Sequence, residues 1–357
     1  MNEDTSNEAL RALSTHLNEG IERLEQLNIG TTLSSLPKYA MVGDQSAGKS
    51  SIVQALCGIP LPRGDGTTTR CPFYITTSSQ TPSSGSWACN VSIKQQHDYE
   101  PNEGTWNNNG KLNVTVFGTV NTQEDLERIL RRAQTALLNP QDNLYKHARM
   151  ESDNDKSPQV YFSPNLVCLD YQAPGIPELA FYDLPGCISN YDMSKPGETT
   201  PENSRQQQEN LVNMINSTVT DYIKDEQCLV LVACSADQDV ETSKTMSFIR
   251  MHRAEERCIG VFTKADLVTS GKVAAVKKVL RGEKYPLGKG GKKWFITRQP
   301  SQQDIDRGLD FVAAAKLEDG LFAKGPWSAE RKLRGQYGTK LLRQEIAGSL
   351  ARHIQSE

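Results

Sequence analysis

The chain has 357 residues, of which 37% are hydrophobic, enough for one large domain with appendages or for two domains. A formal net charge of −3 excludes a general basic surface for nucleic acid or anionic lipid, so no nucleic-acid partner is expected. Eight cysteines without a C-x-x-C pair indicate buried thiols in a reducing compartment, and the acidic start MNEDTSNEAL is unlike a signal or transit peptide. The predicted location is cytoplasmic.

Apolar residues recur at three- and four-residue spacing near both ends of the chain. They are Leu10, Leu13, Leu17, Ile21, Leu24 and Leu27 in the first stretch, and Leu342, Ile346, Leu350 and Ile354 in the second. The spacing predicts one amphipathic helix within residues 1–30 and another within 326–357. Because neither apolar stripe is stable in water alone, we expect the two helices to pack as a small bundle beside the main domain.

Short apolar runs alternate with helical segments between these ends. The runs are KYAMV up to residue 42, 179–183, 228–234, 258–263 and 293–297, with helices expected at 204–224 and 240–253. Such runs are typical of parallel strands buried on both faces. The predicted fold class is therefore α/β, with a central, mostly parallel sheet flanked by helices.

Three further segments alternate between apolar and polar residues. Residues 73–77, 87–93 and 112–120 predict added antiparallel strands, and the polar tract NEGTWNNNG at 102–110 predicts an exposed loop. The basic segment 272–293 is expected to be a solvated surface helix and loop, since aromatic residues are almost absent from it.

A glycine-rich loop, GDQSAGKS, follows the first predicted strand and precedes a predicted helix. It matches the phosphate-binding pattern G-x-x-x-x-G-K-[ST], and the flanking strand and helix disfavour a chance glycine turn. Lys49 is expected to reach the β- and γ-phosphates, and Ser50 to ligate Mg²⁺. The predicted nucleotide contacts here are Gly43, Asp44, Gln45, Ser46, Ala47, Gly48, Lys49, Ser50 and Ser51.

Two tetrapeptides follow later strands. In DLPG, Asp183 is suited to hold Mg²⁺ through water and Gly186 to present its N–H to a γ-phosphate. In TKAD, which begins at Thr263, Asp266 is suited to accept hydrogen bonds from N1–H and N2–H₂ of guanine, while the Lys264 stem lies along the base. Each alone is also an ordinary turn or helix start, but together and in this order they predict a guanine nucleotide site.

The segment LPRGDGTTTRCP at 61–72 is expected to be a mobile loop that senses the γ-phosphate. One of its threonines should complete the Mg²⁺ shell. Composition leaves Thr67, Thr68 and Thr69 equally open.

GDQSAGKSS, LPRGDGTTTRCP, DLPG and TKAD together resemble the GTPase domain of the dynamin superfamily, and look closest to its myxovirus-resistance (Mx) branch and related fungal dynamin-like proteins. The resemblance implies a P-loop GTPase domain over residues 31–325, with the sheet extended by extra strands. It also implies that residues 1–30 and 326–357 form the family's bundle signalling element.

The resemblance further implies roles for residues that the general motif leaves free. Gln45 orients a water beside the attacking water, Ser46 helps to hold a monovalent cation (Na⁺ or K⁺), and Thr69 is the threonine that binds Mg²⁺. The implied catalytic residues are Gln45, Ser46, Lys49, Thr69 and Gly186. The implied metal ligands are Ser50, Thr69 and Asp183 for Mg²⁺, and Asp44, Ser46, Gly64 and Gly66 for the monovalent cation. Thr297, Arg298 and Gln299 stand in the base-closing segment, where the family often has N-R-S-Q.

These residues predict a dynamin-like GTPase with Mg²⁺ that hydrolyses GTP to GDP and phosphate and is stimulated when two GTPase domains meet across their nucleotides. By resemblance, the process served is membrane remodelling, organelle division or a related assembly. Membrane association is expected only indirectly, or through the family's helical stalk, which these residues do not include. The alternative is a GTP-dependent docking module with weak or vestigial hydrolysis. An adenine nucleotide motor is disfavoured by Asp266.

Overall fold

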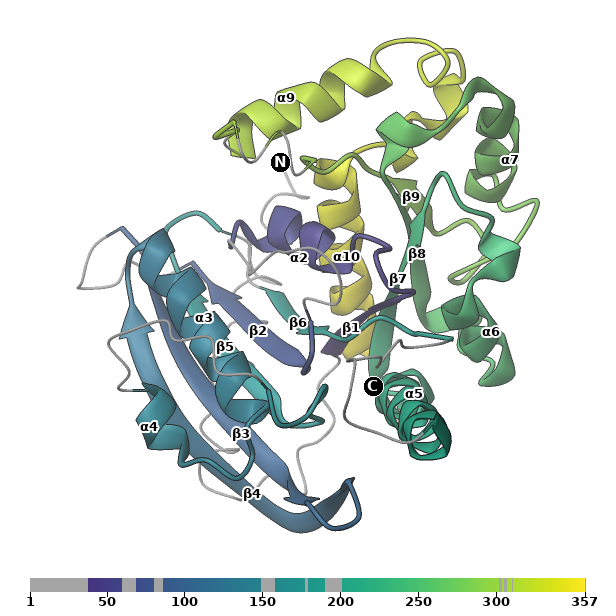
Figure 1. The fold of residues 1–357 in the computed structure, drawn as a ribbon. Helices are drawn as coiled ribbons and strands as arrows, with labels where there is room; N and C mark the ends of the chain where they lie inside the picture. The colour runs from purple at the N-terminus through teal and green to yellow at the C-terminus, as the bar shows by residue number, and fades with distance from the viewer. Residues whose placement is uncertain are drawn as a thin grey trace.

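A nine-stranded sheet forms the centre of the protein (Figure 1). The computed structural model describes residues 38–59, 69–79, 86–148, 158–176, 179–189 and 201–356, with short gaps at 302–303, 305–306 and 310. The strands are β1 (Lys38–Gly43), β2 (Phe73–Ser78), β3 (Ala88–Glu100), β4 (Thr105–Val120), β5 (Leu166–Gln172), β6 (Leu179–Asp183), β7 (Cys228–Ser235), β8 (Cys258–Thr263) and β9 (Trp294–Ile296). Their order across the sheet is β4-β3-β5-β2-β6-β1-β7-β8-β9.

The half of the sheet that carries the predicted site is parallel. Strands β6, β1, β7, β8 and β9 all run the same way, and Met41 pairs with both Asp183 and Leu231. Strands β7 and β8 are buried along their whole length, which explains their continuous apolar runs. This parallel arrangement brings the carboxyl ends of β1, β6 and β8 to one edge of the sheet, the usual place for a ligand site in α/β folds.

The other half of the sheet is mixed. Strand β2 is antiparallel to β6 but parallel to β5, while β3 is antiparallel to both β5 and β4. The alternating segments predicted as added strands are therefore confirmed as strands. The predicted loop at 102–110 is wrong in part, because β4 begins at Thr105 and turn residues occupy only 101–104. A cross-strand pair of Tyr99 and Trp106 rings, 5.2 Å apart, supports this longer hairpin.

Helices cover both faces of the sheet. The α-helices are α2 (Lys49–Cys57), α3 (Gln123–Leu137), α4 (Leu144–Ala148), α5 (Pro201–Lys224), α6 (Lys244–Met251), α7 (Ser270–Leu280), α9 (Phe311–Phe322) and α10 (Thr339–Ser356). Short 3₁₀ turns are η1 (Val240–Thr242), η2 (Glu255–Arg257), η3 (Ala265–Leu267) and η4 (Arg331–Gln336). One core cluster joins the sheet to α2, α3 and α10, and a second joins it to α5, α6 and α7. Figure 1 shows α3 across the β3–β5 end of the sheet and α5, α6 and α7 grouped at the other end.

Four of the helices and strands were not predicted: β5, α3, α4 and α9. The β5 sequence LVCLDYQ carries polar residues within a short apolar run, so its signal is weak. Helix α3 had a readable signal: Leu126, Leu130 and Leu137 lie on one buried face, and the Thr122 side chain caps the helix by accepting from the Asp125 N–H.

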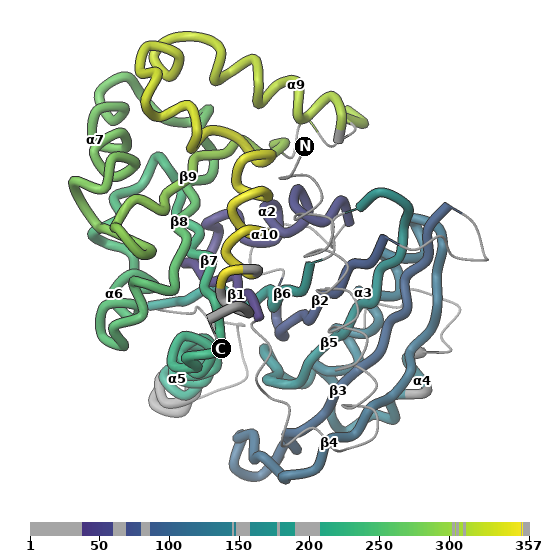
Figure 2. Tube along the Cα trace, turned by 180° about the vertical axis from the view of Figure 1, so that it is seen from behind, coloured from purple at the N-terminus to yellow at the C-terminus, as the bar shows by residue number. Residues whose placement is uncertain are grey.

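The C-terminal helix α10 is part of the core. Leu342 and Ile346 are fully buried, and Figure 2 shows α10 running beside α2. The Tyr39 hydroxyl donates to the Ile346 carbonyl at 2.8 Å, and Arg343 Nη2 donates to the Ala55 carbonyl at 2.8 Å. The predicted helix within 1–30 lies outside the described residues, so its pairing with α10 and the domain boundaries stay predictions.

All eight cysteines are buried free thiols, as the sequence predicts. Burial raises the pKa of those in the core, for example Cys57 to about 12, which keeps the thiols protonated at neutral pH. Across the described ranges, every helix is too short or too polar to span a bilayer.

Candidate nucleotide-binding site

The loop between β1 and α2 ends in an open helix N-terminus. Helix α2 begins after Gly48 without a side-chain cap and without an acidic residue in its first turn. Ser46 and Gly48 take left-handed backbone conformations, with φ of 61° and 83°. The first N–H groups of a helix have no partner within the helix, so this turn has donors that can bind an anion such as phosphate.

Lys49 places a buried cation in this loop. Its side chain is 6% exposed, and Nζ donates to the Gly43 and Asp44 carbonyls at 3.3 and 3.2 Å. Burial lowers the pKa of Lys49, against the opposing charges of Asp183 and Asp44. Within the described residues no carboxylate lies within ion-pair distance of this ammonium, so an anionic ligand would supply the missing counter-charge.

Three oxygen-bearing side chains meet beside Lys49. Ser50 Oγ donates to Asp183 Oδ2 at 2.7 Å and lies 3.2 Å from Thr69 Oγ1. They come from three separate elements, namely the start of α2, the end of β6 and the segment before β2. The structure therefore brings together the three residues predicted to bind Mg²⁺.

Asp183 is a buried carboxylate that can bind a cation. It is 1% exposed, burial raises its pKa to about 6, and the Ser50 hydrogen bond and the Lys49 charge act in the opposite direction. Its Oδ1 atom is buried and has no partner among the described residues. The donors gathered here are two hydroxyls and a carboxylate, and oxygen ligands of this kind suit a hard cation such as Mg²⁺.

Gly186 lies against the glycine loop. A Cβ atom at this position would be 2.6 Å from Gln45 Cα and 3.1 Å from Lys49 Nζ. The next residue fastens the two segments together: Cys187 N–H donates to the Gly43 carbonyl at 3.1 Å, and Gln45 N–H donates to the Cys187 carbonyl at 3.2 Å. The backbone of DLPG therefore lies in contact with the backbone of the phosphate loop. The Gln45 and Ser46 side chains are exposed.

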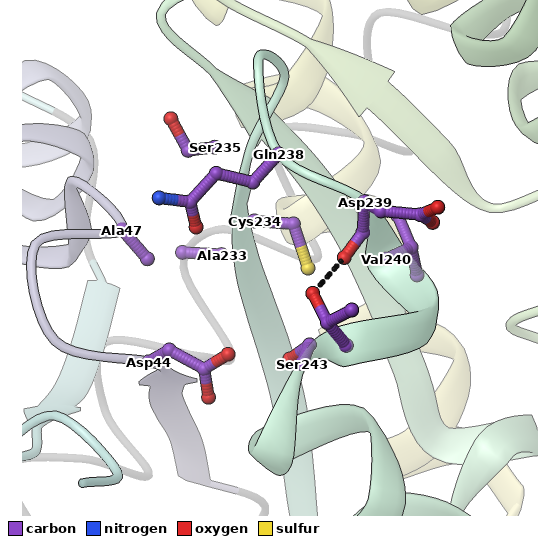
Figure 3. A pocket seen from close by; sticks show the side chains of 10 residues that line it. Asp44, Ala47, Ala233, Cys234, Ser235, Gln238, Asp239, Val240 and Ser243 are labelled. Carbon is purple, nitrogen blue, oxygen red and sulfur yellow. Dashed lines mark hydrogen bonds between the residues drawn. The ribbon is translucent and has the colours of Figure 1, made fainter. Parts of the chain in front are cut away.

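The Asp44 carboxylate faces away from the phosphate loop. It accepts from the Thr245 N–H at 2.9 Å, the Thr245 hydroxyl at 2.8 Å and the Lys244 N–H at 3.2 Å, at the first turn of α6. Figure 3 shows Asp44 and Ala47 on one side of a small pocket, with the segment from Ala233 to Ser243 on the other. Gly64 and Gly66 lie outside the described residues, so the monovalent cation set stays a prediction.

The TKAD segment is bonded to the phosphate loop. Thr263 is buried and its hydroxyl donates to the Ala47 carbonyl at 2.8 Å, while Lys264 Nζ donates to the Ser46 carbonyl at 2.9 Å. Lys264 has a left-handed φ of 55°, and the Asp266 side chain is exposed.

The base-closing segment follows β9 and packs on TKAD. The Ala265 N–H donates to the Thr297 carbonyl at 3.2 Å, and the buried Thr297 hydroxyl donates to the Phe262 carbonyl at 3.1 Å. Arg298 Nη2 donates to Asp304 at 2.8 Å. Arg298 Nη1 and Gln299 Nε2 are buried donors without an acceptor among the described residues, as expected beside a ligand that offers acceptors.

Some residues that position the site were not predicted. Lys244 and Thr245 donate hydrogen bonds to the Asp44 carboxylate. The sequence signal for this helix start was the run Ser243-Lys244-Thr245, because Ser243 caps α6 by accepting from the Met246 N–H. Ser51, predicted as a contact, lies partly buried within α2.

A sheet that is parallel where it carries the site, an uncapped glycine-loop helix, a serine–threonine–aspartate cluster and an aspartate after a neighbouring strand define a P-loop nucleotide-binding domain of the GTPase class. The chain belongs to the dynamin family, whose family model matches residues 40–265. The predicted resemblance is thereby confirmed.

Named relatives agree with this family. The chain is 28% identical over 336 residues to the interferon-induced GTP-binding protein Mx2 of Homo sapiens, covering 94% of this chain and 39% of that protein. It is 27% identical over 335 residues to Mx1 of Equus caballus and 26% identical over 336 residues to Mx of Solea senegalensis. These alignments cover 94% of this chain and 42% and 45% of those proteins. The chain thus spans about two fifths of the length of the curated relatives it matches.

Proposed function

We propose that this protein binds GTP with Mg²⁺ and hydrolyses it to GDP and phosphate by attack of a water in line with the leaving oxygen. The observation that carries the proposal is the cluster of Ser50, Thr69 and Asp183 beside the buried Lys49, inside a dynamin-family domain. The open N-terminus of α2 binds the phosphates, and Mg²⁺, held by the Ser50 and Thr69 hydroxyls, neutralises charge on them.

Each residue of the site has a separate role in hydrolysis. Lys49 stabilises the charge that develops between the β- and γ-phosphates, and Gly186 donates its N–H to the γ-phosphate. Gln45 orients the water beside the attacking water. Ser46, with a monovalent cation, replaces the charge that an arginine supplies in other GTPases. The contact between DLPG and the phosphate loop supports this arrangement.

Turnover is expected to require two copies of the protein. The Gln45 and Ser46 side chains are exposed on the phosphate loop, where a partner domain can cover them and exclude water. This exposure supports a homodimer across the nucleotides. In the cell, we infer that the domain serves membrane remodelling, organelle division or a related assembly in the cytoplasm, with any membrane contact made indirectly.

Base recognition by Asp266 is directly testable. In Asp266→Asn, the side chain offers one acceptor and one donor, which no longer match the two donors of guanine but match the N1–H and O2 of xanthine. We expect kcat/KM for GTP to fall ~30-fold, or about 2 kcal/mol, and that for xanthosine triphosphate to rise. The measurement is phosphate release with each nucleotide.

A matched control for this variant is Asp221→Asn on α5, where the side chain is 68% exposed and only loosely paired with Lys224. It is expected to leave both nucleotide preferences unchanged. Equal use of GTP by Asp266→Asn and the unmodified protein would remove Asp266 from the base site. Absence of Mg²⁺-dependent phosphate release in the unmodified protein would overturn the proposed function itself.

A further inference from the structure

The carboxylate of Glu318 lies at a junction between three parts of the chain. Glu318 is on α9 and is 5% exposed. Its Oε1 accepts from the Arg298 N–H at 2.8 Å and from the Thr339 hydroxyl at 3.1 Å, and its Oε2 accepts from the Thr339 N–H at 2.8 Å. One side chain therefore binds the backbone of the base-closing segment and the first turn of α10 together.

This junction is reinforced by backbone contacts. The Gly338 N–H donates to the Ile296 carbonyl at 2.8 Å, and Tyr337 forms an isolated parallel bridge with Ile296. The start of α10 is thus bound to the end of β9, one residue before Thr297. Further along, α10 reaches the phosphate-loop helix, where Arg343 donates to the Ala55 carbonyl.

Burying the Glu318 carboxylate at this junction costs free energy. A buried carboxylate without a counter-ion is destabilised, and burial raises the pKa of Glu318 while its three donors oppose that shift. Within the described residues no lysine, arginine or histidine pairs with Glu318. The two segments it joins would each lose a hydrogen-bond acceptor if they moved apart, which makes the carboxylate a specific link rather than a general packing contact.

We propose that Glu318 is a positioning residue that couples guanine-base binding at residues 297–299 to the N-terminal turn of α10. The proposal rests on the proposed function, because it takes residues 297–299 as part of the base site. Glu318 holds the Arg298 N–H in place, and thereby positions the Arg298 guanidinium and the Gln299 amide, whose Nη1 and Nε2 atoms are buried without an acceptor among the described residues. Coupling between two sites is reciprocal, so base binding in turn stabilises the start of α10.

The test uses three variants of the full chain. Glu318→Gln keeps the shape but turns an amide donor toward one of the two backbone donors, Thr339→Val removes only the hydroxyl donor, and Asp319→Asn changes the neighbouring exposed carboxylate on α9. The readouts are the Kd and dissociation rate of a fluorescent GDP, kcat and KM for GTP, and hydrogen exchange of a peptide over 337–345 with and without GDP.

For Glu318→Gln we expect GDP affinity to fall ~10-fold through faster dissociation, KM for GTP to rise by a similar factor, and kcat to change less than ~2-fold. Thr339→Val should have a smaller effect of ~3-fold, and Asp319→Asn should have none. GDP should slow exchange over 337–345 in the unmodified protein and in Asp319→Asn, but not in Glu318→Gln.

A Glu318→Gln variant with unchanged GDP affinity, or with the same GDP-dependent protection over 337–345 as the unmodified protein, would overturn the coupling. The same holds if Thr339→Val, which leaves both backbone hydrogen bonds in place, has no effect on GDP dissociation. Either result leaves GTP hydrolysis by the unmodified protein intact, so failure of this inference is distinguishable from failure of the proposed function.

Discussion

Replacing Gly186 by alanine is expected to reduce GTP turnover by at least ~1000-fold, because the added methyl group would overlap neighbouring backbone atoms. Its Cβ would lie 2.6 Å from Gln45 Cα and 2.8 Å from Gln45 N, which are backbone atoms and cannot rotate away. The DLPG segment and the phosphate loop must separate, so both the Gly186 N–H and Lys49 leave the γ-phosphate. The measurement is single-turnover phosphate release, with nucleotide binding followed separately.

The matched control is Gly271→Ala on α7, where an added Cβ meets nothing within 4 Å and the backbone is helical. It is expected to keep full turnover and to gain up to about 1 kcal/mol of stability from the lower entropy of its unfolded chain. Near-normal turnover in Gly186→Ala would show that the close approach of DLPG to the phosphate loop is unimportant for hydrolysis.

Replacing Asp183 by asparagine is expected to separate stability from activity. The pKa of Asp183 in the folded protein is about 6, above its ordinary value of 3.8, so the metal-free folded state binds more protons than the unfolded state between these values. The contribution of this group to stability is therefore fully present below pH 3.8 and is lost as pH rises through 6. Two pKa units correspond to about 3 kcal/mol.

The asparagine variant cannot ionise, so without Mg²⁺ it should lack this loss of stability between pH 4 and 7. Its turnover should nevertheless fall ~100-fold, since it no longer holds the Mg²⁺ water shell. Chemical denaturation at several pH values, with and without Mg²⁺ and GDP, checks both statements. If the unmodified protein shows no decline in stability over this range, burial does not raise the pKa of Asp183.

Local chemistry explains which parts of the site were predictable. Lys49 and Ser50 follow from one continuous motif between a strand and a helix, and both lie in the first turn of α2, where Ser50 donates to Asp183. Asp183 and Thr263 each end a fully apolar strand, so their meeting at one sheet edge follows from parallel pairing.

Other parts of the site and of the fold depend on contacts between segments that are distant in the sequence, and local sequence patterns do not predict such contacts. The Asp44 bond to Thr245 spans 201 positions, and Glu318 meets Arg298 and Thr339 only because α9 and α10 pack beside β9. The asparagine-rich tract at the start of β4 has low intrinsic strand preference, yet pairing with β3 makes it a strand. In each case the tertiary partner, rather than the local pattern, decides the structure.

GTP hydrolysis by this domain is proposed to use Gln45 and to be completed when two copies meet. The most direct measurement is GTP hydrolysis per molecule as a function of protein concentration, for the unmodified protein and for Gln45→Ala, with Mg²⁺ in Na⁺ or K⁺ buffer. We predict that specific activity rises with concentration in the unmodified protein and falls at least ~100-fold in Gln45→Ala. A rate that is independent of concentration and unchanged in Gln45→Ala would show that neither Gln45 nor the pairing of two copies takes part in hydrolysis.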